Sequence, residues 1–170
     1  MKKIFYYLIA IVALLNLNAC VGYKPIFESS TLNFKIVDYS IAGDKKLGNK
    51  IYKKLYNVSK RGDNPEVKNL YMYININKNK EATTKDSAGK ILAYKISVSA
   101  NISLKDIMKG NQILNESFSY SSSYKAQDLY SETIQLENRY TEDLINKIYQ
   151  NLLIKISEAT LDKWFLKATK

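Results

Sequence analysis

The chain has 170 residues, with 26 Lys and Arg against 16 Asp and Glu, one cysteine, no histidine and a net charge of +10. This length suits one domain, and a single cysteine excludes a scaffold stapled by internal disulfides. The lack of histidine removes the usual general base and zinc ligand near neutral pH. Part of the basic excess also fits AT-rich codon usage, since Lys, Asn, Ile and Tyr dominate the composition.

The N-terminal segment has the features of an export signal. Lys2 and Lys3 precede an apolar run over residues 4–15, which is shorter than the ~20 residues of a spanning helix and fits a signal-peptide core. Ala19 followed by Cys20 resembles a bacterial lipobox, although Asn18 departs from the small or apolar residue usual there. We expect a lipoprotein signal peptide over 1–19, a covalent acyl lipid on Cys20 and a lipidated tether over 20–31. An ordinary cleaved signal peptide and an uncleaved anchor remain alternatives.

The first half of the remaining chain predicts a strand, a helix and a second strand. Partial alternation predicts a strand over 32–41, and apolar residues three or four apart predict a helix that begins after Asp44 and ends near Arg61 and Gly62. Alternating apolar and polar residues over 70–77 predict a half-buried strand. The polar residues 78–90 are expected to form a long exposed loop or hairpin tip.

The second half predicts two more strands and a long helix. Residues 92–105 alternate strictly, and a turn at 109–111 leads to a strand over 114–124, whose apolar face Glu116 interrupts without an evident reason. A broad apolar stripe predicts a helix from about 131 to 159. In the tail after it, Trp164 and Phe165 either pack on the sheet edge or anchor at a partner or bilayer.

The order of these elements is strand, helix, three strands, helix. We therefore predict a single α+β domain over 32–170, in which two helices pack on one face of a four-stranded, mostly antiparallel or mixed sheet. Serine, asparagine and lysine residues at alternate positions of the longest strand, among them Ser97, Ser99, Asn101 and Ser103, would form a polar face on its other side.

Motifs for catalysis are missing from the sequence. It has no G-x-S-x-G, P-loop or G-x-G-x-x-G pattern. We expect a protein that is not an enzyme and that holds no metal and no cofactor beyond the acyl lipid on Cys20. An envelope hydrolase built on paired carboxylates stays open as an alternative. A basic exported protein meets anionic envelope partners such as lipid phosphates, and export argues against a nucleic-acid partner.

The residues after the cysteine carry a family resemblance. Cys20-Val21-Gly22-Tyr23-Lys24-Pro25-Ile26-Phe27 resembles the start of mature LptE, the lipopolysaccharide-assembly lipoprotein, with Val21 as a small departure. The predicted element order resembles that family across nearly the whole mature chain. The resemblance implies an outer-membrane lipoprotein on the periplasmic side that helps an LptD β-barrel assemble, plugs its lumen and contacts lipopolysaccharide. The alternative is a periplasmic lipid- or barrel-binding lipoprotein without a dedicated LptD partner.

Lysines gather in two groups, and one of these groups is a candidate for contact with an anionic partner. Lys78, Lys80, Lys85 and Lys90 flank the predicted central loop, and lysine is a flexible point charge suited to phosphate. We predict that they touch lipid A phosphates or the barrel wall, with a merely solvated loop as the alternative. The basic residues of the first helix, Lys46, Lys50, Lys53 and Lys54, are expected to form a solvated helix surface.

Overall fold

The computed structural model describes residues 34–59 and 67–168, with side chains up to residue 159. The chain divides into two units, Met1–Thr31 and Leu32–Lys170, and every described residue belongs to the second. The predicted signal peptide, tether and lipidated Cys20 lie outside the described residues. The helix end predicted near Arg61 and the side chains of Trp164 and Phe165 lie outside them too.

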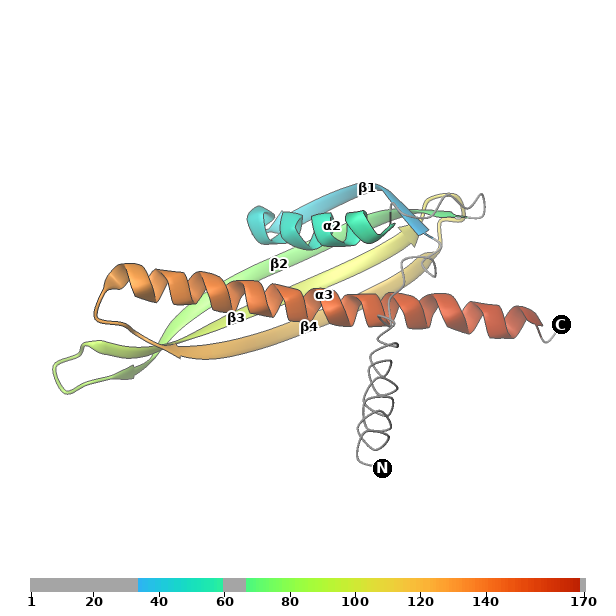
Figure 1. The fold of residues 1–170 in the computed structure, drawn as a ribbon. Helices are drawn as coiled ribbons and strands as arrows, with labels where there is room; N and C mark the ends of the chain where they lie inside the picture. The colour runs from blue at the N-terminus through green and yellow to red at the C-terminus, as the bar shows by residue number, and fades with distance from the viewer. Residues whose placement is uncertain (1–33, 60–66, 169–170) are drawn as a thin grey trace, which may run out of the picture. The chain divides into compact units, whose positions relative to one another are not determined.

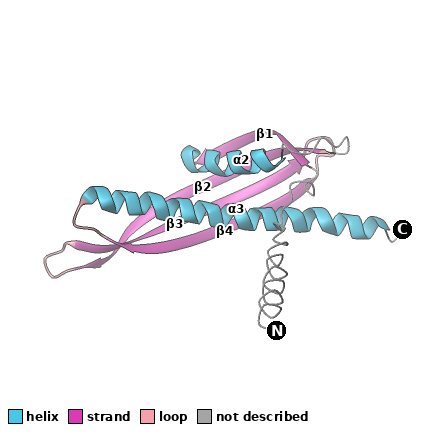
Figure 2. Cartoon of the chain, viewed as in Figure 1, coloured by secondary structure: helices cyan, strands magenta, loops and turns pink. Residues whose placement is uncertain are grey.

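The described chain folds in the order that the sequence predicts (Figures 1 and 2). Its elements are β1 (Phe34–Gly43), α2 (Lys45–Ser59), β2 (Lys68–Lys85), β3 (Ile91–Asp106), β4 (Gln112–Lys125) and α3 (Tyr130–Ala168). The strands form one sheet in the order β1-β2-β3-β4, with β1 parallel to β2 and the other pairs antiparallel. Both helices lie on the same face of this mixed sheet (Figure 1), so the predicted α+β class is confirmed.

Strict alternation along the central strands builds the core. Every second residue of β3 from Ile96 to Leu104 is buried, and the same rule holds along β2 from Leu70 to Ile76. The buried stripe of α3, which packs on β3 and β4, consists of Leu144, Ile145, Ile148, Leu152, Leu153 and Ile156. A strand pairs its neighbours edge to edge and points alternate side chains to opposite faces, so one face of this sheet becomes apolar and the other polar.

Helix α2 begins as its sequence predicts and packs closely on β1. The Asp44 side chain accepts a hydrogen bond from the Leu47 N–H at 3.1 Å, which is N-terminal capping. Gly48 faces β1, where a Cβ atom would lie 2.4 Å from the Ile41 Cγ2 atom. The glycine therefore permits a close helix–strand approach that any side chain would block.

Of the two alternatives predicted for residues 78–90, the hairpin tip is confirmed and the long loop is wrong, because β2 continues to Lys85 and the turn occupies only Asp86–Gly89. Lys78 and Lys80 pair across the hairpin with Val98 and Ile96 of β3. Backbone pairing with a long neighbouring strand thus extends β2 although its own side chains there are polar. Helix α3 is also longer than predicted and ends at Ala168.

Two residues, Glu116 and Leu92, depart from the burial pattern of their strands. Glu116 lies half-buried on the helix side of β4, and no contact with another described residue explains its place on that face. Leu92 continues the apolar set of β3 yet is 42% exposed, because β4 ends at Lys125 opposite Ala93 and the hairpin runs on alone.

A pair of isoleucines on α3 tests how the helix contributes to the core. Ile148 is fully buried, whereas Ile154 on the same helix is 41% exposed. We expect Ile148→Ala to lower the free energy of unfolding by about 2–5 kcal/mol, because it leaves a cavity under the helix.

Ile154→Ala is the matched control and is expected to change the free energy of unfolding by no more than about 0.5 kcal/mol. Urea denaturation followed by circular dichroism measures both. An equal loss of unfolding free energy in the two variants would contradict the assignment of Ile148 to the buried side of α3.

Candidate functional site

The most extensive feature of the domain beyond its core is the sheet face that neither helix covers, here called the open face (Figure 1). It is formed by the residues of β2, β3 and β4 that alternate with the buried set and pair with one another across the sheet. Those residues are Tyr71, Tyr73, Asn75, Asn77, Asn79, Glu81, Lys95, Ser97, Ser99, Asn101, Ser103, Lys105, Asn115, Ser117, Ser119, Ser121, Ser123 and Lys125.

Short hydroxyl and amide side chains line up in rows across the open face. One row joins Asn75, Asn101 and Ser117, and within it the Ser117 hydroxyl donates a hydrogen bond to the Asn101 Oδ1 at 2.6 Å. Such groups both donate and accept hydrogen bonds. The open face can therefore contact water or another uncharged polar wall without leaving buried charges unpaired.

Charge on the open face gathers toward its ends. Glu81 and Lys95 lie opposite each other and form an ion pair at 3.5 Å. Both side chains are about half exposed, so this pair adds little stability. The long middle of the face, around Ser99 and Ser119, is uncharged.

The four lysines predicted to contact phosphate do not form one cluster. Lys78 and Lys80 lie on the helix-covered side, where their amino groups contact the Glu137 carboxylate of α3 at 2.9 and 2.7 Å. Lys80 also lies over the Tyr94 ring, 4.2 Å from its centre. These two lysines therefore join the hairpin to α3.

The other two predicted lysines are more exposed. Lys90 forms an exposed ion pair with Asp128 at 3.8 Å, and Lys85 ends β2 without an ion pair to any described residue. A role of these lysines in binding lipid phosphates stays a prediction, now centred on Lys85 and Lys90.

Glu137, whose carboxylate binds both Lys78 and Lys80, is absent from the residues predicted from the sequence. Partial burial tends to raise the pKa of its carboxyl, but the hydrogen bonds from Lys80 and Lys78 outweigh burial and leave the pKa below its ordinary value. The sequence does place Glu137 on the buried side of α3, because Glu137, Thr141 and Leu144 follow one another at helical spacing. Lys78 and Lys80 likewise continue the inward positions of β2.

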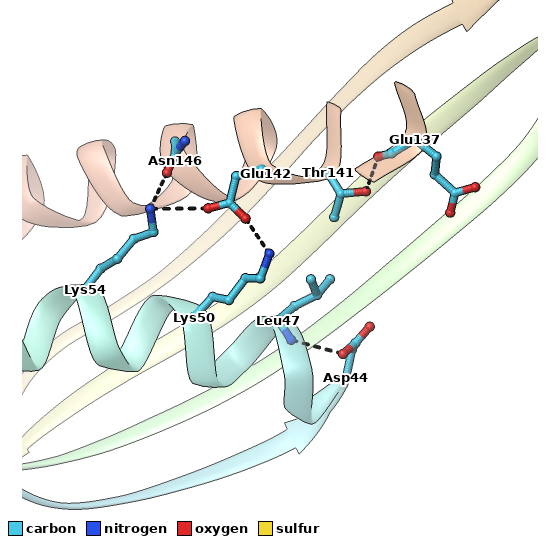
Figure 3. A network of polar contacts seen from close by, with 8 residues as sticks. All are labelled: Asp44, Leu47, Lys50, Lys54, Glu137, Thr141, Glu142 and Asn146. Carbon is cyan, nitrogen blue, oxygen red and sulfur yellow. Dashed lines mark hydrogen bonds and ion pairs between the residues drawn. The ribbon is translucent and has the colours of Figure 1, made fainter. Parts of the chain in front are cut away.

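A second polar network joins the two helices (Figure 3). Glu142 of α3 contacts the amino group of Lys50 and lies 3.3 Å from that of Lys54, which also donates to Asn146 Oδ1 at 2.6 Å. The hydrogen bond from Lys50 is the main reason that the pKa of Glu142 is lowered. Lys50 and Lys54 therefore serve the helix–helix contact, which corrects their prediction as solvated residues, while Lys46 and Lys53 are exposed as expected.

Neither a metal cluster nor a membrane-spanning helix occurs within the described part of the chain. Its residues contain no group of three or more Asp, Glu, His or Cys arranged to hold a metal ion. Among its helices, none combines the length and the apolar character that a membrane crossing needs.

Comparison with known proteins relates this fold to three solved lipoproteins. No protein-family model and no curated protein sequence matches the chain. A protein from Caulobacter crescentus described as a lipoprotein superposes with a TM-score of 0.54 at 13% identity, covering 78% of this chain and 93% of that one. Rare lipoprotein B from Shewanella oneidensis superposes with a TM-score of 0.51 at 12% identity, covering 74% of this chain and 97% of that one. A minor lipoprotein from Acinetobacter baumannii superposes with a TM-score of 0.50 at 14% identity, covering 71% of this chain and 90% of that one. At these identities the likeness is one of fold.

The contact between Glu137 and the two lysines predicts a pH-dependent contribution to stability. Because the folded-state pKa of Glu137 is lowered, its contribution is present above the ordinary carboxyl pKa and is lost as the pH falls through the folded value. We expect Glu137→Gln to lower the free energy of unfolding at pH 7 by about 1–2 kcal/mol.

The difference between Glu137→Gln and the native chain should vanish at a pH below the folded-state pKa, where the native carboxyl is protonated. Asp143→Asn, an exposed acid in the interior of the same helix, is the control and should have little effect at either pH. A difference that persists at low pH would show that Glu137 acts through shape rather than charge.

Proposed function

We propose that this chain is an outer-membrane lipoprotein that helps an LptD-like β-barrel assemble, occupies its lumen during lipopolysaccharide transport and contacts lipopolysaccharide. The observation that carries the proposal is the open face. In this proposal the chain is not an enzyme and holds no cofactor, and its partners are the barrel, lipopolysaccharide and the membrane that its acylated Cys20 enters.

The chemistry of the open face supports a place in a barrel lumen. The lumen of a large outer-membrane barrel is polar and wet, while its outer surface is apolar. At about 3.3 Å per residue, the strands of the open face extend over roughly 45–50 Å. A long wall of serine and asparagine side chains can match such a lumen through direct and water-mediated hydrogen bonds.

Sequence and fold support the same proposal independently. Residues 20–27 resemble the start of mature LptE. The domain shares its fold with rare lipoprotein B and with two other lipoproteins. The sequence around Val21 and Gly22 lacks the aspartate signal for inner-membrane retention, which favours the outer membrane.

Charged residues substituted into the open face test directly whether the domain occupies a barrel lumen, here called the plug proposal. Ser99 and Ser119 pair across β3 and β4, and both are exposed. We expect Ser99→Lys combined with Ser119→Lys to reduce recovery of the barrel with the C-terminally tagged chain by about tenfold or more, because two charges would press against the lumen wall. The measurement is a pull-down from outer membranes in mild detergent, with copurifying proteins identified by mass spectrometry.

The matched control adds the same two charges elsewhere. Gln135 and Gln150 are exposed residues of α3, and Gln135→Lys with Gln150→Lys should leave barrel recovery unchanged. If the native chain copurifies with no β-barrel from membranes in which the barrel is abundant, the plug proposal fails. An independent lipid-binding lipoprotein then becomes the better account.

The hairpin lysines test contact with lipopolysaccharide separately. We expect Lys85→Glu with Lys90→Glu to weaken binding of purified lipopolysaccharide by about tenfold or more, since each reversal turns attraction for lipid A phosphates into repulsion. Lys46→Glu with Lys53→Glu, on exposed positions of α2, is the control of equal charge. Unchanged binding in the hairpin variant would remove these lysines from the site.

A further inference from the structure

The turn between β3 and β4 exposes two apolar side chains in a fixed conformation. Ile107 is 47% exposed and Met108 is 82% exposed. The Asp106 Oδ1 accepts hydrogen bonds from the Met108 and Lys109 N–H groups at 2.9 and 3.1 Å, and the Ile107 N–H donates to the Asn69 carbonyl at 3.0 Å. These hydrogen bonds fix the turn to the end of the sheet, so its two apolar side chains are exposed in a defined position.

Basic residues lie at the same end of the sheet as these apolar side chains. Lys105 and Lys109 flank the turn, and strand pairing brings Lys68 and the start of β1 with Lys35 to the same end of the sheet. The described segments of this end, 34–37, 67–70 and 105–113, contain one acid, Asp106. Asp106 is only 5% exposed and is bonded within the turn, so the surface of these segments is apolar and positive.

The chain also enters the domain at this end. Phe34, the first residue of β1, pairs with Lys68, and Cys20 precedes it in the sequence. A segment of this length reaches at most about 50 Å when fully extended. An acyl chain on Cys20 would therefore hold this end of the sheet within that distance of the bilayer.

We propose that the turn over 106–111 is a membrane-contact tip. Ile107 and Met108 enter the headgroup boundary of a bilayer that contains anionic phospholipid, while Lys35, Lys68, Lys105 and Lys109 lie against the phosphates. This combination of a small apolar area and clustered lysines is the chemistry of interfacial membrane contact. The inference rests on the membrane attachment in the proposed function and is independent of the barrel and of lipopolysaccharide.

The opposite end of the domain lacks the same combination. Leu129 and Tyr130 at the start of α3 are 61% and 74% exposed, but Asp128 and Glu132 flank them. Acidic neighbours oppose contact with an anionic surface. Lys90 is bound to Asp128 in an ion pair, and Lys85 lies on the β2–β3 hairpin. The two ends therefore differ in the charge that directly flanks their exposed apolar side chains.

Fluorophores placed at the two ends test the proposal. Met108→Cys and Tyr130→Cys are made separately in the full chain, labelled with an environment-sensitive fluorophore and reconstituted into vesicles of phosphatidylethanolamine and phosphatidylglycerol. A chain without an added cysteine gives the background from Cys20. The two positions are separated along β4 by on the order of 45 Å, so a quencher attached to lipid headgroups should quench position 108 strongly and position 130 weakly.

A charge variant identifies the cause of the contact. Lys105→Gln with Lys109→Gln in the Met108→Cys chain should lower the ratio of membrane-inserted to free tip roughly tenfold on anionic vesicles. Raising the salt concentration should act in the same direction. Lys46→Gln with Lys53→Gln, at exposed positions of α2, is the control that removes equal charge away from the tip.

Three results would overturn the inference. The first is a label at position 108 that stays in water or is quenched no more than the label at position 130. The second is a chain that fails to associate with the vesicles. The third is shielding of position 108 without lipid that grows with protein concentration, which would identify a second copy of the chain as the occupant. Neither loss of barrel recovery nor unchanged lipopolysaccharide binding affects these readouts, so failure of the tip and failure of the plug are distinguishable.

Discussion

The structure depends on burial of one face of a long sheet. Alternate residues of β2 and β3 point into a single apolar layer, and α2 and α3 close that layer from one side. Burial of these side chains supplies the main favourable term in folding. It also determines the polar side, because residues that alternate with a buried set must point outward. The open face is thus a direct result of how the core is built.

Polar contacts then hold each helix in place over that layer. Glu137 binds two lysines of the hairpin, and Glu142 binds two lysines of α2. Each carboxylate lies at a partly buried position between elements, where paired charges are better protected from solvent than on the surface. Lysines that look like part of a general positive surface therefore divide into joining residues and exposed residues, and only the exposed set is available to a partner.

The sequence predicts the order of elements, the α+β class and the two faces of β3, because strict alternation and helical spacing follow directly from burial. It does not predict the length of β2, since Lys78 and Lys80 belong to a strand only through pairing with β3. The separation of the four hairpin lysines depends on Glu137, which is distant in the sequence. The turn at Ile107 and Met108 looks ordinary until strand register brings it beside Lys68 and the start of β1.

The parallel pairing of β1 with β2 has a mechanical consequence. Because β1 starts at the end where the chain enters, tension on that entering segment along the strand would load the β1–β2 hydrogen bonds together, in shear, instead of opening them one after another. Backbone pairing from Phe34 to Gly43 would share such a load. A domain held in a partner while its N-terminal segment is pulled toward a membrane would therefore resist extraction through its first strand.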